Sequence, residues 1–110
     1  MAKREIIKTK DLLLKLFRTR KIHLDKIVIF GSSVKKTFRS DSDIDIILVS
    51  RDFRNKDIFA RVSLVNGIHS DIVERINRPI DLMFYSDQEW EKGNSIIMNT
   101  AKNEGLVFSV

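Results

Sequence analysis

Two short apolar segments separated by a turn constrain the fold of this chain more than any other feature. Residues 27–30 and 44–49 consist of Ile, Val, Leu and Phe, interrupted only by Asp45, and such runs are typical of buried strands. Gly31 and Ser32 end the first run, and three aspartates within five residues open the second. Packing alone does not require charged side chains at the entrance of a buried strand, so this region is the first candidate for a functional site.

Strand alternation brings two of these aspartates together. Side chains alternate between the faces of a strand, so Asp43 and Asp45 share one face while Ile44 and Ile46 share the other. Like charges about 4 Å apart repel by about 4 kcal/mol at an effective dielectric constant near 20, so both stay ionised only if a cation lies between them. Carboxylate oxygens without a cysteine or a histidine cluster favour magnesium or manganese over zinc.

The turn supplies features of an anion site. Gly31 permits a tight backbone turn, and the residues that follow can open a helix whose free N–H groups face an anion. Ser32 adds a hydroxyl donor, and Lys35, Lys36 and Arg39 add positive charge. Together with the carboxylates, this segment predicts a site for a nucleoside triphosphate whose phosphates are bridged to the aspartates by metal ions.

A further aspartate, Asp81, lies between Ile80 and Leu82 in a later apolar run. An ionised carboxylate buried in a strand costs several kcal/mol unless a partner compensates its charge. A metal ion or a buried lysine or arginine would each provide that partner. Because the upstream aspartates already indicate a metal site, we predict that Asp81 is a metal ligand.

The aspartate spacing also imitates the beginning of a calcium-binding loop. Such a loop requires glycine at its sixth position and glutamate at its twelfth, where this chain has Ile46 and Asp52. We therefore exclude a calcium loop. Asp41, the first aspartate of the series, is expected to cap the loop or to face solvent.

Length and composition limit the class of protein. A chain of 110 residues predicts a single domain, residues 1–110, with one hydrophobic core. The chain has no cysteine, no apolar leader and no run near the ~20 apolar residues of a membrane span, so we expect a cytoplasmic protein without a membrane partner. The net charge of +5 is compatible with nucleic acid, but no aromatic platform interleaves with the basic residues, so nucleic acid ranks last among the expected partners.

The hydrophobic pattern predicts an α/β (α+β) sandwich with a small mixed central sheet flanked by helices. The expected strands span residues 26–30, 43–49, 80–85 and 106–110. The expected helices span residues 3–19, a short stretch ending before Arg39, a segment beginning near residue 58, and a stretch around residues 96–98 that Gly105 ends. The helix near residue 58 either ends by residue 65 or continues past Gly67 to residue 76. Asp87 is the predicted N-cap of a helix after the third strand.

At these motifs the sequence resembles the DNA polymerase β-like nucleotidyltransferases. The resemblance rests on Gly31-Ser32, on Ser42-Asp43-Ile44-Asp45 and on Asp81 inside the apolar strand that follows Pro79. It covers nearly the whole chain and is greatest for the small stand-alone members called minimal nucleotidyltransferases (MNT). The resemblance implies the nucleotidyltransferase fold.

The resemblance also implies roles for individual residues. In that family the first two aspartates of the motif hold two magnesium ions, and the third ligates one of them near the acceptor hydroxyl. Asp43, Asp45 and Asp81 are thereby expected to be the metal ligands and catalytic residues, with Mg²⁺ or Mn²⁺ as cofactor. Gly31 and Ser32 are expected at the triphosphate.

The family further implies a donor and a partner. Minimal nucleotidyltransferases are frequently paired with a small helical HEPN protein in toxin–antitoxin modules, where the transferase adenylylates its partner. We therefore expect ATP as donor and a protein hydroxyl, that of a tyrosine, as acceptor. Larger relatives have a second domain that binds the acceptor, so we expect another chain, a HEPN protein or a second copy, to complete the site here.

The sequence departs from the family pattern at two positions. The family often has an arginine directly after the Gly-Ser pair and a second glycine four residues after the serine, where this chain has Ser33 and Lys36. We expect both residues at the nucleotide, with Lys36 contacting phosphate. The departures leave open a second class of function, a catalytically weak or inactive module of the same fold that acts by binding a partner protein.

Overall fold

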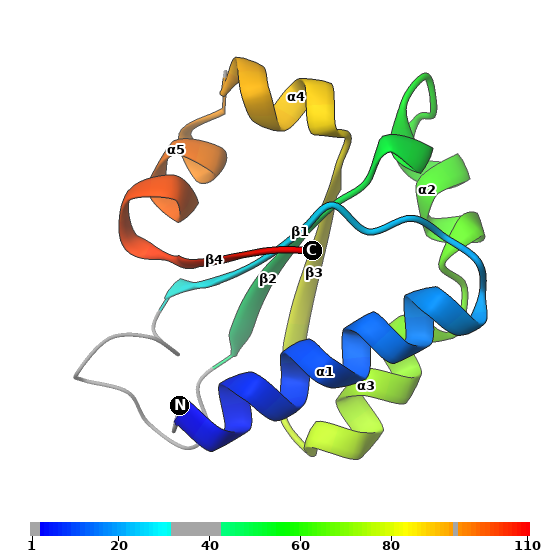
Figure 1. Ribbon diagram of the computed structural model, residues 1–110, viewed down its shortest axis with the longest axis vertical. Coiled ribbons are helices and arrows are strands. Elements are labelled where there is room, and N and C mark those ends of the chain that lie inside the picture. Colours follow the sequence, from blue (N-terminus) through cyan, green and yellow to red (C-terminus); the bar gives the residue numbers. More distant parts are fainter. Residues whose placement is uncertain (1–2, 32–42, 94) are drawn as a thin grey trace.

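The computed structural model describes residues 3–31, 43–93 and 95–110 (Figure 1). Its strands are β1 (Lys26–Phe30), β2 (Ile44–Val49), β3 (Ile80–Tyr85) and β4 (Leu106–Ser109). Its helices are α1 (Lys3–Thr19), α2 (Ile58–Leu64), α3 (Ile68–Ile76), α4 (Asp87–Lys92) and α5 (Ile96–Glu104), with a 3₁₀ turn η2 (Arg51–Phe53) after β2. Within these ranges, no helix is both long enough and apolar enough to cross a membrane.

The four strands form one mixed sheet in the order β3-β2-β1-β4. Strand β1 runs antiparallel to both β2 and β4, whereas β2 and β3 are parallel. The α3 helix lies in the connection from β2 to β3, which a parallel pair requires. The predicted α+β architecture with a small mixed sheet is confirmed.

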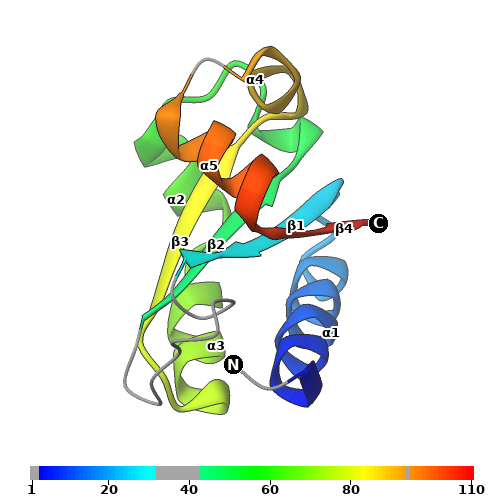
Figure 2. The same ribbon diagram turned by 90° about the vertical axis from the view of Figure 1, so that its left-hand side faces the viewer.

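Helices cover both faces of the sheet (Figure 2). The α1 and α3 helices pack on one face, and α4 and α5 lie over the other. Ile46 belongs to the first core, whereas its neighbour Ile47 belongs to the second together with Trp90 of α4. The predicted alternation of side chains along β2 is therefore confirmed, and it assigns Asp43 and Asp45 to the face of Ile47.

Most predicted boundaries agree with the structure. The α1 helix and strands β1 and β3 have the predicted ends, and β2 begins at Ile44, one residue later than predicted. The segment near residue 58 does not continue as one helix, because α2 ends at Leu64 and α3 begins at Ile68. Gly67 lies between them with φ of 88°, a left-handed conformation that an α-helix cannot contain. The short helix predicted before Arg39 falls outside the described residues.

The predicted N-cap of α4 is wrong. Ser86, not Asp87, caps the helix, since its hydroxyl accepts a hydrogen bond from the backbone N–H of Glu89. The Glu89 carboxylate in turn accepts from the backbone N–H of Ser86 at 2.8 Å, which completes a capping box. Asp87 is the first residue of the helix and forms an ion pair with Arg54.

Candidate active site

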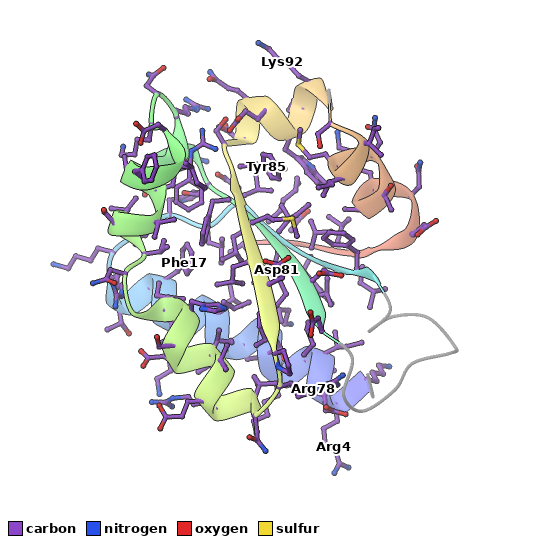
Figure 3. All side chains as sticks on the ribbon, turned by 180° about the vertical axis from the view of Figure 1, so that it is seen from behind. Arg4, Phe17, Arg78, Asp81, Tyr85 and Lys92 are labelled. Carbon is purple, nitrogen blue, oxygen red and sulfur yellow. The ribbon has the colours of Figure 1, made fainter. Side chains whose placement is uncertain are left out.

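Strand pairing brings together the three aspartates that the sequence singles out. Asp45 of β2 and Asp81 of β3 are direct partners in the parallel ladder. Asp43 directly precedes β2 and lies two residues before Asp45, on the same face. Figure 3 shows Asp81 on β3, with Arg78 just before the beginning of that strand. The described backbone thus pairs Asp45 with Asp81 and places Asp43 near the same end of the sheet.

The three carboxylates differ in exposure. Asp45 is partly buried, whereas Asp43 and Asp81 are exposed. The expectation that Asp81 is buried is wrong, because β3 is an edge strand and the side chain of Asp81 stays open to solvent. The alternative of a buried cationic partner fails as well, since no lysine or arginine of the described ranges forms an ion pair with any of the three.

The three carboxylates interact electrostatically, and the interaction affects the pKa of Asp45. Burial raises the pKa of the Asp45 carboxyl above its ordinary value, and the negative charges of Asp81 and Asp43 raise that pKa further. Among the residues that the structure describes, no cationic side chain is paired with Asp45, and its ionised form is therefore disfavoured. A bound cation would relieve this repulsion.

Gly31 makes room for this carboxylate. Its φ of +83° lies in the left-handed region, and a Cβ atom added to it would lie 2.2 Å from Oδ2 of Asp45. Phe30, the residue before the glycine, is the cross-strand partner of Asp45, which explains the close approach. Only glycine satisfies both the backbone conformation and the space that Asp45 occupies.

The other predicted phosphate contacts lie outside the described residues. These are Ser32, Ser33 and Lys36, together with the nearby Lys35, Arg39 and Asp41. Their predicted roles remain predictions. The described half of the site consists of Gly31 and the three aspartates.

The residues fit a divalent metal by their chemistry. Among the described residues, no three His, Cys, Asp or Glu side chains are grouped closely enough to hold a metal ion between them. Magnesium does not need such a cage, because proteins usually bind it through one or two carboxylates while substrate phosphates and water supply the remaining ligands. The mutual repulsion of Asp45, Asp81 and Asp43 is the property of the site that a cation would use.

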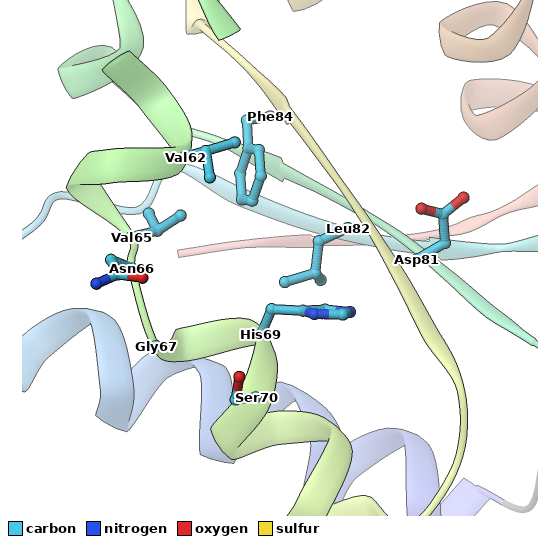
Figure 4. Close-up of a pocket in the computed structure, with 9 residues that line it drawn as sticks. All are labelled: Val62, Val65, Asn66, Gly67, His69, Ser70, Asp81, Leu82 and Phe84. Atoms are coloured by element: carbon cyan, nitrogen blue, oxygen red, sulfur yellow. The ribbon is translucent and has the colours of Figure 1, made fainter. Parts of the chain in front are cut away.

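A pocket that the sequence did not indicate lies beside β3. Its volume is about 390 Å³, and it is lined by Val62, Val65, Asn66, Gly67, His69, Ser70, Asp81, Leu82 and Phe84 (Figure 4). Figure 4 shows the Asp81 carboxylate pointing away from the Leu82 and His69 side chains, to the other side of β3. Asp81 thus lines the pocket, while its carboxylate group points to the other side of β3.

The α2 helix above this pocket was predicted by its apolar residues, but it buries none of them. Ile58, Phe59 and Val62 are all exposed, and Phe59 retains 79% of its accessible surface. Helical spacing of apolar residues does not by itself distinguish a core-facing helix from one with an open apolar surface.

Comparison with known families identifies the chain. The model of the family described as polymerase beta nucleotidyltransferase matches residues 4–109. The chain belongs to this nucleotidyltransferase family. Among curated proteins, none matches the sequence.

Solved structures share the fold of this nucleotidyltransferase. A toxin–antitoxin structure with AMP-PNP has a TM-score of 0.64 at 22% identity, covering 91% of this chain and 73% of that chain. The MntA–HepT toxin–antitoxin has a TM-score of 0.57 at 19% identity, with 93% and 71% covered. A tri-AMPylated HEPN toxin from Shewanella oneidensis in complex with its MNT antitoxin has a TM-score of 0.55 at 21% identity, with 93% and 71% covered. At these identities the likeness establishes the fold.

Proposed function

We propose that this nucleotidyltransferase transfers a nucleoside monophosphate, AMP from ATP, to a hydroxyl group of a partner protein. The observation that carries the proposal is the juxtaposition of Asp45 and Asp81 on parallel strands, with Asp43 on the same face and Gly31 beside them. Carboxylates that form no ion pair among the described residues, next to a glycine turn, are suited to a metal-bound triphosphate.

Asp81 is the residue in this site best placed to receive the acceptor. It is exposed on an edge strand, so a protein hydroxyl can approach its carboxylate from solvent. In the proposed reaction the hydroxyl oxygen forms a bond to the α-phosphorus, the bond from that phosphorus to the bridging oxygen breaks, and pyrophosphate leaves. The hydroxyl proton passes to the Asp81 carboxylate.

Asp43, Asp45 and Asp81 would hold the metal ions. Magnesium bound there would neutralise phosphate charge and polarise the acceptor hydroxyl. The backbone at Gly31, with Ser32, Ser33 and Lys36, would hold the triphosphate. Of the three, Asp45 is partly buried, whereas Asp43 and Asp81 are exposed.

The partner we propose is a helical HEPN-type protein, for which this chain would be the antitoxin. Two of the structures that share its fold are described as toxin–antitoxin complexes, and a third holds an AMPylated HEPN toxin with its MNT antitoxin. A tyrosine hydroxyl on the partner is the proposed acceptor.

Co-expression with a HEPN-type partner tests this proposal. Intact-mass analysis of the purified partner should show the addition of one or more AMP groups. The same partner co-expressed with the Asp45→Asn protein should keep its unmodified mass. Full modification by the Asp45→Asn protein would refute the proposed site, whereas an unmodified partner that is nevertheless bound and neutralised would refute transfer.

That last outcome defines a second candidate function, a partner-binding module of the same fold without catalysis. The observation in its favour is that the described carboxylates do not form a ready-made metal group. Replacing Ser33 with arginine and Lys36 with glycine distinguishes the two functions. A degenerate site should gain magnesium-dependent ATP binding from these changes, whereas a working site should already bind ATP without them.

A further inference from the structure

The two edges of the sheet differ in how their backbone groups are used. At the β3 edge, the guanidinium of Arg61 donates a hydrogen bond to the carbonyl of Phe84 at 2.9 Å. Nε2 of His69 lies 2.6 Å from the carbonyl oxygen of Ile80 at the same edge. Side chains therefore occupy two of the outward carbonyl acceptors that a further strand would need, which disfavours strand addition at the β3 edge.

The β4 edge is open. The backbone N–H of Val110 donates to the carbonyl of Asp25 on the β1 side, and the register pairs Phe108 with Ile27. In an antiparallel ladder, the backbone N–H and C=O groups of successive residues point alternately toward one side of the strand and toward the other. The backbone groups of Val107 and Ser109 therefore point outward, away from β1. Within the described ranges, nothing forms a hydrogen bond with these outward N–H and C=O groups.

The side chains along this edge are apolar except for that of Ser109, and none is charged. Leu106, Val107 and Val110 are exposed, and Val110 retains 66% of its accessible surface. Residues 106–110 contain no charged side chain, although the whole chain carries a net charge of +5. Natural edge strands are usually protected by lysine, proline or a bulge, and the described β4 strand shows none of these. Figure 2 shows β4 at the rim of the sheet, between α5 and α1.

We propose that β4 pairs antiparallel with β4 of a second copy of this chain, with Phe108 of both copies on the two-fold axis. Val107 of each copy then pairs with Ser109 of the other, and two such pairs exchange four hydrogen bonds. This register satisfies the outward backbone groups of both residues.

The side chains of the segment are self-complementary in this register. Phe108 meets Phe108 of the second copy at a non-hydrogen-bonded position, where side chains approach most closely and aromatic pairs are favourable. Leu106 lies opposite Val110 of the second copy on the same face. Every cross-strand pair on the face of α1 is therefore apolar, and the Lys10 ammonium of the same copy lies 5.4 Å from the centre of the Phe108 ring.

A second copy suits this edge better than an unrelated partner, because Leu106 and Val110, the residues two positions before and after Phe108, are both apolar. A contact between two such short strands is small beside the roughly 800 Å² per partner of a standard stable interface, so we expect a weak, reversible dimer. The carboxylates lie on β2 and β3, on the other side of β1, so both sites remain open in the dimer.

Sedimentation velocity over a range of concentrations tests the dimer. The 12.8 kDa chain should approach twice its monomer mass as concentration rises. Val107→Pro removes an outward N–H without touching the bonds to β1, so it should weaken the dimer at least tenfold. Val107→Thr retains the N–H and should leave the dimer intact. A wild-type protein that stays monomeric, or a folded Val107→Pro protein that dimerises like wild type, overturns the proposal.

Cysteine cross-linking tests the register and does not depend on the proline variant. The chain has no cysteine, so single substitutions are unambiguous. Directly opposed Cα atoms at a non-hydrogen-bonded position lie about 4.5 Å apart, within disulfide range. Phe108→Cys should therefore form a disulfide-linked dimer under mild oxidation, whereas Leu106→Cys should not. Equal linkage through Leu106→Cys, or linkage only through Phe59→Cys on α2, would place the contact elsewhere and overturn the proposal.

Discussion

Asp45 and Asp81 lie opposite each other on neighbouring parallel strands, and no cationic side chain of the described residues is paired with either. Burial, followed by the charges of Asp81 and Asp43, raises the pKa of Asp45. A fold that places ionisable groups of like charge this close loses stability unless a cation is bound. This relationship connects the chemistry of the site to measurable properties of the protein.

Replacing Asp81 with asparagine should abolish most transfer without harming the fold. The side chain is exposed, so its loss removes no buried contact. Loss of a proton acceptor typically lowers the rate by about 10² to 10⁴-fold. The measurement is the initial rate of AMP incorporation into the partner. Asp11→Asn is the matched control, since Asp11 is an exposed aspartate on α1, and it should transfer at the wild-type rate. Equal activity of Asp81→Asn and Asp11→Asn would remove Asp81 from the site.

Asp45→Asn should stabilise the metal-free protein at neutral pH. Because the pKa of Asp45 is raised in the folded state, the native protein binds this proton more tightly than the unfolded chain does. The resulting stabilisation is complete below the unfolded pKa and is lost as the pH rises through the folded pKa. At neutral pH the ionised Asp45 therefore opposes folding.

Thermal melts in chelator measure this effect. The asparagine variant should exceed wild type by less than about 1 kcal/mol at pH 7, since solvent screens a partly exposed group. The difference should shrink as the pH falls through the raised pKa of Asp45, because the wild-type carboxyl then takes up its proton. Melts with the opposite pH trend would show that Asp45 is stabilised by a partner within the protein.

Gly31→Ala should destabilise the protein through two separable effects. A left-handed φ costs an alanine about 1–2 kcal/mol, and its Cβ also collides with the Asp45 carboxylate. Gly93→Ala is the matched control, because Gly93 also has a positive φ of 61° but faces the ends of the Lys102 and Asn99 side chains. Urea unfolding should show a larger loss for Gly31→Ala.

A double-mutant cycle isolates the contact with Asp45. Adding Asp45→Ala to Gly31→Ala removes the carboxylate and should recover part of the lost stability, with a coupling of about 0.5–3 kcal/mol. Strictly additive free energies would show that Gly31 is required for its backbone conformation alone.

Ser86→Ala should cost about 1 kcal/mol of stability, because it removes the side-chain half of the α4 capping box. Asp87→Asn should cost less, since the pair that it weakens with Arg54 is largely exposed to solvent. Chemical unfolding of the two variants compares them directly. A larger loss of stability for Asp87→Asn than for Ser86→Ala would show that Asp87 stabilises the first turn of α4 more than Ser86 does.

Local patterns predicted the elements of this fold well. The strand that begins after Pro79 and the helix spanning residues 3–19 have the predicted ends, because proline and helical periodicity act over a few residues. The N-cap of α4 was predicted wrongly because serine and aspartate are both favourable N-cap residues. The N-cap is the one of the two that has an extended backbone conformation, which in the structure is Ser86. Gly67 interrupts a helical pattern that apolar spacing alone would continue.

The sequence indicated which residues are candidates for the site, but it did not indicate how they are arranged in space. Alternation indicated that Asp43 and Asp45 share a face, but the pairing of Asp45 with Asp81 depends on a parallel ladder between strands distant in sequence. The exposure of Asp81 follows from the edge position of β3, which the order of strands decides. The contact of Gly31 with Asp45 likewise arises across two strands.

Calorimetric titration of ATP into the isolated protein tests the central claim most directly, because it requires no knowledge of the partner. We predict binding that depends on magnesium, disappears in chelator and is lost in the Asp43→Asn protein, with GTP, CTP and UTP binding more weakly. Absence of binding at millimolar ATP with magnesium, or binding that Asp43→Asn leaves unchanged, would contradict a metal-dependent nucleotide site at these aspartates.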